Sequence, residues 1–144
     1  MKKLVFTLFI LSAVVGLFSC EKDEIENNIY LSRIIGVWKT SYEYNGLNVV
    51  EYLYFQDNGI YTYATEQTFN GVTAGKVEKS SWTISNLRLL YCQGEVFKIE
   101  KLTTDELVIS RYVDLPGFEP DIEYTFQRST YEELEPLIAK YKLK

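Results

Sequence analysis

The sequence predicts an all-β protein, an eight-stranded antiparallel up-and-down barrel with a short C-terminal helix. From Gly36 onward the 144-residue chain consists of short alternating runs, rich in aromatic and β-branched residues and separated by turn residues. The connections are too short to contain a crossover helix, so neighbouring runs are expected to pair antiparallel. A meander of eight strands closes into a barrel because closure removes its unpaired edges.

Turn residues set the limits of the eight runs. Asn45-Gly46 and Asn70-Gly71 are strong hairpin signals, because both central residues of the favoured two-residue turn need a positive φ. Further short turns are expected at Ser85-Asn86 and Gln93-Gly94. The predicted strands are Val37–Tyr44, Leu47–Gln56, Ile60–Phe69, Val72–Ile84, Leu87–Cys92, Val96–Leu102, Leu107–Val113 and Asp121–Arg128.

Pairing across these turns predicts which side chains share the barrel interior, because alternate residues of a strand point to opposite faces. A bulge is expected at Gly94, since a regular turn there would move Phe97 and Ile99 to the outer face. The register after Lys101 stays open. The residues expected to face the interior and to line a ligand cavity are Tyr42, Glu51, Phe55, Tyr61, Tyr63, Trp82, Tyr91 and Tyr124.

The same pairing points four charged side chains inward: Glu51, Lys76, Glu78 and Arg111. An unpaired buried charge is costly, so these groups should form pairs or line a wet rim. Glu51, expected opposite Thr40 and Thr65, is the best candidate for a polar contact to a ligand. Glu51 and Glu78 also suggest the two carboxylates of a glycosidase, but no other feature of the sequence supports that hypothesis.

The C-terminal segment has a helical pattern. Thr130 and Glu133 form the spacing of a capping box. Apolar residues then recur at helical intervals from Leu134 to Tyr141. Because Pro136 fits poorly inside a helix, we expect a short turn and then a helix from about Glu135, lying against or plugging the barrel.

The first residues predict export rather than a folded element. Met1-Lys2-Lys3 is positively charged, and the following fifteen residues, 4–18, carry no charge. This run is shorter than the ~18 or more apolar residues of a membrane-spanning helix and is typical of a secretory signal peptide. The expected organisation is a cleaved signal over 1–19, a tether over 20–33 and a barrel with its helix over 34–144.

Leu17-Phe18-Ser19-Cys20 resembles the lipobox of bacterial lipoproteins. The resemblance implies that Cys20 becomes the lipidated first residue of the mature chain and holds the protein on the outer membrane of a Gram-negative bacterium. Lys22-Asp23-Glu24 is similar to a surface-export signal, which implies the cell surface, although a periplasm-facing position stays open. The alternatives are an ordinary cleaved signal with an incidental cysteine and a merely hydrophilic tether.

Composition excludes several functions. The chain has no histidine, which removes Ser-His-Asp and Cys-His catalysis and most catalytic zinc sites. We therefore expect no metal, no cofactor and no enzymatic activity; a carboxylate site for calcium stays open, although the sequence has no D-x-[DN]-x-[DN]-G loop. The expected mature chain has 13 Lys and Arg against 20 Asp and Glu, so nucleic acid is not an expected partner. Cys92 is the only cysteine besides Cys20, which leaves no intramolecular disulfide for the barrel.

Gly36-Val37-Trp38 resembles the Gly-x-Trp signature of lipocalins, and Arg128 resembles the arginine that packs over that tryptophan. The segments 53–61, 82–84 and 106–109 are similar to bacterial lipocalin-like lipoprotein domains. The resemblance covers residues 34–128 and implies structural roles for Gly36, Trp38 and Arg128. It departs from the family in two respects. The lipocalin helix precedes the last strand, and this domain is short, which leaves a small or a filled cavity as the expectation.

The resemblance implies a barrel that binds a small apolar or amphipathic molecule without catalysis. The alternative is a filled barrel that acts as a protein- or glycan-interaction module through exposed tyrosines. Four tyrosines are expected to point outward: Tyr30, Tyr52, Tyr54 and Tyr112.

Overall fold

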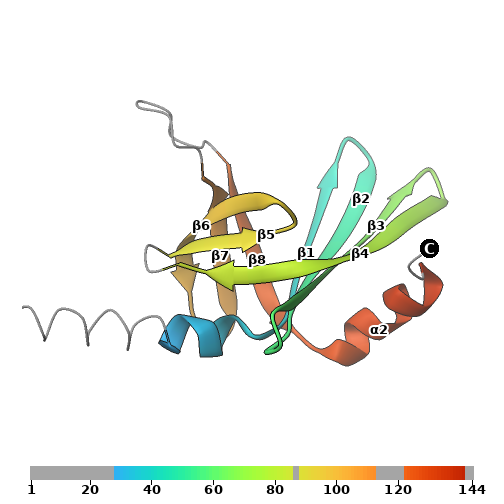
Figure 1. The fold of residues 1–144 in the computed structure, drawn as a ribbon. Coiled ribbons are helices and arrows are strands. Elements are labelled where there is room, and N and C mark those ends of the chain that lie inside the picture. Colours follow the sequence, from blue (N-terminus) through green and yellow to red (C-terminus); the bar gives the residue numbers. More distant parts are fainter. Residues whose placement is uncertain (1–27, 86–87, 113–121, 142–144) are drawn as a thin grey trace, which may run out of the picture.

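The computed structural model describes residues 28–85, 88–112 and 122–141, so the expected signal peptide, Cys20 and the export signal lie outside the described residues. The eight strands form a closed barrel in which each pairs antiparallel with its chain neighbours and β8 returns to β1 (Figure 1). The predicted fold class is confirmed. The strands are β1 (Gly36–Tyr44), β2 (Leu47–Phe55), β3 (Ile60–Phe69), β4 (Val72–Ile84), β5 (Leu89–Cys92), β6 (Glu95–Leu102), β7 (Glu106–Arg111) and β8 (Glu123–Ser129), followed by helix α2 (Tyr131–Lys140).

The barrel is closed at one end only. β1 pairs with β8 over Val37–Lys39 alone, and β4 pairs with β5 over Trp82–Ile84 alone. By contrast, β3 and β4 pair along ten residues, up to their shared turn. The hairpins β1–β2 and β3–β4 therefore extend beyond the closed part, as Figure 1 shows. Their inward-facing side chains form one wall of the open end.

The closed end holds an aromatic core. Trp38, Phe55, Tyr61 and Trp82 belong to one buried cluster, as the pairing analysis predicts. The ring centroid of Phe55 lies 5.1 Å from that of Tyr61 and 5.3 Å from that of Trp82. The indole N–H of Trp82 donates to the carbonyl of Gln56 at 2.9 Å, so its one polar group is satisfied.

A helix over residues 28–34 covers this closed end, in a segment mostly expected as tether. Ile34 is fully buried in the core cluster, and Tyr30 packs against it. The carbonyl of Ile34 accepts the indole N–H of Trp38 at 2.8 Å. The folded domain therefore starts earlier than residue 34.

The turn between β4 and β5 corrects the predicted face of Tyr91. Trp82 pairs with Cys92, and Thr83 pairs with Tyr91. The N–H of Ser85 donates to the carbonyl of Leu89 at 2.9 Å. The expected Ser85-Asn86 turn would have paired Trp82 with Leu89, so the observed pairing is shifted by three residues, an odd number. Since one residue reverses the face of a strand, Tyr91 points outward and Cys92 takes the interior position.

The bulge predicted at Gly94 is also wrong. Gln93 and Gly94 have φ of 57° and 76°, as in a regular two-residue turn. Phe97 and Ile99 still face the core because the change of face occurs one turn earlier. The bulge lies instead between Ile99 and Lys101, which sets the register that the sequence left open.

Helix α2 begins before the predicted Glu135 and contains Pro136, so that prediction is wrong. The helix forms because Leu134 is fully buried against an outer-face cluster that includes Val37 and Tyr52. Thr130 occupies the N-cap without a side-chain hydrogen bond, so the capping box does not form. Helix α2 lies against the outside of the barrel and does not plug it (Figure 1).

Candidate functional site

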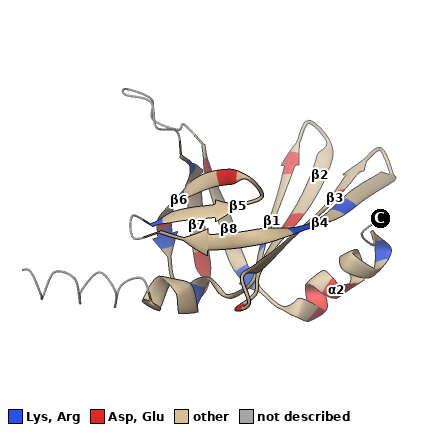
Figure 2. Ribbon diagram, in the orientation of Figure 1, with Lys and Arg blue, Asp and Glu red and all other residues tan. Residues whose placement is uncertain are grey.

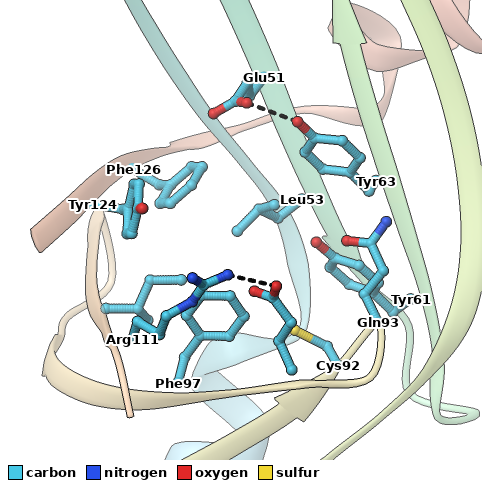
Figure 3. Close-up of a pocket in the computed structure, with 12 residues that line it drawn as sticks. Glu51, Leu53, Tyr61, Tyr63, Cys92, Gln93, Phe97, Arg111, Tyr124 and Phe126 are labelled. Carbon is cyan, nitrogen blue, oxygen red and sulfur yellow. Dashed lines mark hydrogen bonds and ion pairs between the residues drawn. The ribbon is translucent and has the colours of Figure 1, made fainter. Parts of the chain in front are cut away.

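A cavity of about 180 Å³ opens at the unclosed end of the barrel (Figure 3). Its deeper wall is apolar, because Leu53, Ile109 and Phe126 are core residues and Phe97 packs against that core. Polar and charged side chains from β2, β3, β6, β7, β8 and the β5–β6 turn contribute the rest of the lining. The lining residues are Glu51, Leu53, Tyr61, Tyr63, Cys92, Gln93, Glu95, Phe97, Ile109, Arg111, Tyr124 and Phe126.

Glu51 and Tyr63 form the polar contact on one side of the cavity. The hydroxyl of Tyr63 donates to Oε1 of Glu51 at 2.7 Å (Figure 3). Glu51 stands opposite Thr40 in β1 and Thr65 in β3, as the sequence predicts. Burial, and then the hydrogen bond to Glu51, raise the pKa of Tyr63, so the phenol remains a neutral donor at neutral pH.

Arg111 and Glu95 form an ion pair on the other side. Nη2 of Arg111 lies 2.6 Å from Oε1 of Glu95, and both side chains are well exposed (Figure 3). The pair joins the end of β7 to the start of β6 across the cavity mouth. Such an exposed pair contributes about 0–1 kcal/mol to stability, so its main effect is on the electrostatics of the opening.

Lys76 and Glu78 lie apart from the cavity lining. Their side chains pair at 3.1 Å and are about half exposed, in agreement with a wet rim. Nε2 of Gln93 also donates to Glu78, at 2.6 Å. Glu78 is therefore held by other partners, and it does not share the cavity lining with Glu51. The structure therefore does not bring Glu51 and Glu78, the two carboxylates of the glycosidase hypothesis, together in one cavity.

Four of the eight predicted cavity residues line the cavity. Glu51, Tyr61, Tyr63 and Tyr124 line it, whereas Phe55 and Trp82 belong to the core cluster at the closed end. Tyr42 is 50% exposed and does not line the cavity, and Tyr91 points outward. Seven lining residues were not among the predicted cavity residues: Leu53, Cys92, Gln93, Glu95, Phe97, Ile109 and Phe126.

The missed residues come from β2 and from the strands after the β4–β5 turn. The sequence pattern could have predicted Leu53 as a lining residue, since it lies between Glu51 and Phe55 on the same face of β2. Cys92 could not have been predicted in this way, because its inward orientation depends on the register between β4 and β5.

Gly36, Trp38 and Arg128 lie at the closed end, away from the cavity lining. The guanidinium carbon of Arg128 is 3.8 Å from the centroid of the Trp38 ring, which is the contact expected from the lipocalin resemblance. Their position is that of structural residues.

The four outward tyrosines do not form one exposed patch. Tyr52 points outward as predicted, but it is only 4% exposed because it packs in the cluster under α2. Tyr54 is half-buried, with its ring 5.6 Å from that of Tyr131. Tyr30 is half-buried at the closed end, and Tyr112 alone of the four counts as exposed.

The fold and the cavity define a class, a small eight-stranded antiparallel barrel with one open end. Comparison with protein-family models, with curated proteins and with solved structures finds no significant match. In the described part of the chain, no group of three or more His, Cys, Asp or Glu side chains is arranged to hold a metal ion. No helix in these ranges is long and apolar enough to cross a membrane.

Proposed function

We propose that this protein is a lipocalin-like lipoprotein of the bacterial outer membrane whose barrel binds one small amphipathic molecule without altering it chemically. The observation that supports the proposal is a cavity at the open end of the barrel with an apolar inner wall and a polar mouth. Ligand sites combine these features, because apolar walls supply affinity and a few polar groups fix orientation. An eight-stranded barrel is wide enough to hold one small ligand.

The cavity volume limits the size of the ligand. Its 180 Å³ is below the roughly 300–1,000 Å³ of sites for drug-sized molecules. It is close to the roughly 150 Å³ of an apolar cavity that accepts benzene. The proposed ligand therefore has a body of about that size, with its polar end at the open mouth.

Titration with 1-hexanol, followed by protein NMR, tests ligand binding. We expect saturable shifts at Phe97, Ile109 and Phe126, and none in α2. Ile109→Phe should lower the affinity at least tenfold by filling the cavity. Tyr91→Phe, on the outer face of β5, serves as the matched control and should bind like the wild type. Non-saturable shifts, or equal affinity in the Ile109 variant, would contradict the proposal.

The membrane anchor is tested separately in cells. Lipidation of Cys20 predicts incorporation of labelled palmitate and recovery of the protein with the outer membrane. Cys20→Ser should abolish both, whereas Cys92→Ser should change neither. Protease accessibility on intact cells then distinguishes the cell surface from a periplasm-facing position. Equal labelling of the wild type and the Cys20 variant would reject the anchor.

A further inference from the structure

Glu51 is the charged residue of the cavity lining that lacks an opposite charge. The lining contains Glu51, Glu95 and Arg111, and Arg111 pairs with Glu95 at 2.6 Å. Within the described ranges, no lysine or arginine lies within ion-pair distance of Glu51, which accepts a hydrogen bond from the neutral hydroxyl of Tyr63. The lining therefore carries one negative charge in excess.

The basic groups near the opening already have partners. Arg111 is held by Glu95, and Lys76 is held by Glu78. In Figure 2 acidic and basic segments are interspersed along the barrel strands. An anionic ligand would have to compete with these carboxylates for a cation. A cationic ligand would meet Glu51 without breaking an ion pair, so the charge arrangement favours a cation.

Aromatic rings stand beside the free carboxylate. Tyr63 is bonded to Glu51, and Tyr124 lines the same cavity while remaining 40% exposed (Figure 3). Tyr42, half exposed, lies close enough to both Glu51 and Tyr124 that these two groups, after burial, raise its pKa. The ring of Tyr63 already has a cation over it, because Nζ of Lys76 lies 5.6 Å from its centroid. A ligand cation over the ring of Tyr124 would be attracted by its π face, and this attraction would add to that of the carboxylate.

From this arrangement we propose that the cavity selects organic cations, namely a primary or quaternary ammonium group on a small apolar body. The ammonium binds Glu51 beside the ring of Tyr124, and the apolar body lies against Leu53, Phe97 and Ile109. The inference rests on the proposed ligand-binding function and adds the chemical class of the ligand. The acidic balance of the chain favours the approach of a cation.

Three probes of one chain length test the proposal on the full chain: 1-hexylamine, 1-hexanol and hexanoate. At pH 7 the amine is a cation, the alcohol is neutral and the carboxylate is an anion, while the apolar bodies are the same. Calorimetry should show hexylammonium binding at least tenfold tighter than hexanol, and hexanoate binding weakest. Higher salt should reduce the preference for the amine, because screening weakens its attraction to Glu51.

Glu51→Gln assigns the preference to this carboxylate. The amide oxygen still accepts the hydrogen bond of Tyr63, so the variant should retain the fold, which circular dichroism checks. We expect the ratio of amine to alcohol affinity to fall to near one. Glu43→Gln removes an exposed carboxylate from the opposite face of β1 and should keep the wild-type ratio.

The outcomes separate this inference from the proposed function. Saturable hexanol binding without a preference for hexylammonium, or tighter binding of hexanoate, would overturn the cation assignment and leave the cavity as a ligand site. Saturable binding of none of the three probes would overturn both. An equal loss of preference in Glu43→Gln would show that overall charge, and not Glu51, causes the preference.

Discussion

Arg128 lies over the indole ring of Trp38, with its guanidinium carbon 3.8 Å from the ring centroid. The same guanidinium donates to the carbonyls of Arg33 at 2.6 Å, Ile35 at 2.8 Å and Thr104 at 3.0 Å. One side chain therefore joins the last strand to the segment before β1 and to the β6–β7 turn. This fastens the closed end of the barrel.

Replacement of Arg128 is expected to destabilise the barrel. Arg128→Ala loses the cation–π contact and leaves three carbonyls without their donor, and should lower the free energy of unfolding by about 2–4 kcal/mol. Arg128→Lys should recover only part of this, because one ammonium cannot reproduce the planar fork of a guanidinium. Urea unfolding followed by tryptophan fluorescence measures both. A lysine variant as stable as the wild type would contradict the assigned role.

Gly36 is required by the same contact. Its φ is +124°, and a Cβ there would lie 2.6 Å from Nη1 of Arg128. Gly36→Ala should therefore destabilise the protein by about 2–4 kcal/mol, from backbone strain and displacement of Arg128. Gly71→Ala is the control, since Gly71 has φ +77° but no atom within 4 Å of the added Cβ. It should cost only about 1–2 kcal/mol. Equal costs would show that strain alone accounts for Gly36.

Pro136 weakens α2, so its replacement should stabilise the protein. The proline lies at the sixth residue of the helix, is exposed and has no N–H to donate to the carbonyl of Glu132. Pro136→Ala should raise the free energy of unfolding by about 1–3 kcal/mol. Leu134→Ala should lower it by about 2–4 kcal/mol, because Leu134 is fully buried. A stabilising Leu134→Ala would show that the packing of α2 does not support the fold.

Cys92 should make stability fall at alkaline pH. Burial raises the pKa of its thiol to about 12, whereas an unfolded cysteine ionises near 8.5. The stabilising contribution of the buried, protonated thiol is fully present below the pKa of the cysteine in the unfolded state. Between these pH values the unfolded state releases a proton that the folded state retains, so the free energy of unfolding falls as pH rises.

The slope from this one group is about 1.4 kcal/mol per pH unit. Cys92→Ala removes it, so the stability of the variant should decline less steeply between pH 8.5 and 10. Equilibrium unfolding at several pH values measures the difference. Below pH 10 few tyrosines of the unfolded state are ionised, so they add less to the pH dependence of stability than Cys92 does. Parallel curves for the two proteins would show that the thiol is not protected.

Local sequence determined the eight strands and the hairpins of the first half. Asn45, Gly46, Asn70 and Gly71 all adopt positive φ, as two-residue turns demand. Because these turns are predicted correctly, the alternation of side chains along each strand also predicts that Trp38, Phe55, Tyr61 and Trp82 share one core and that Glu51 faces inward. These features depend on residues close together in the chain, which is why periodicity and turn chemistry were sufficient.

Only the tertiary structure decided the rest. A three-residue shift in the pairing of β4 with β5 exchanged Tyr91 for Cys92, and no local preference specifies that register. Burial of Leu134 on the barrel wall outweighed the unfavourable Pro136 and made α2 continuous. The cavity exists because β1 pairs with β8, and β4 pairs with β5, only at the closed end of the barrel. These contacts join residues that are distant in the chain. The free energies of their burial and strand pairing therefore depend on the assembled fold and not on local sequence.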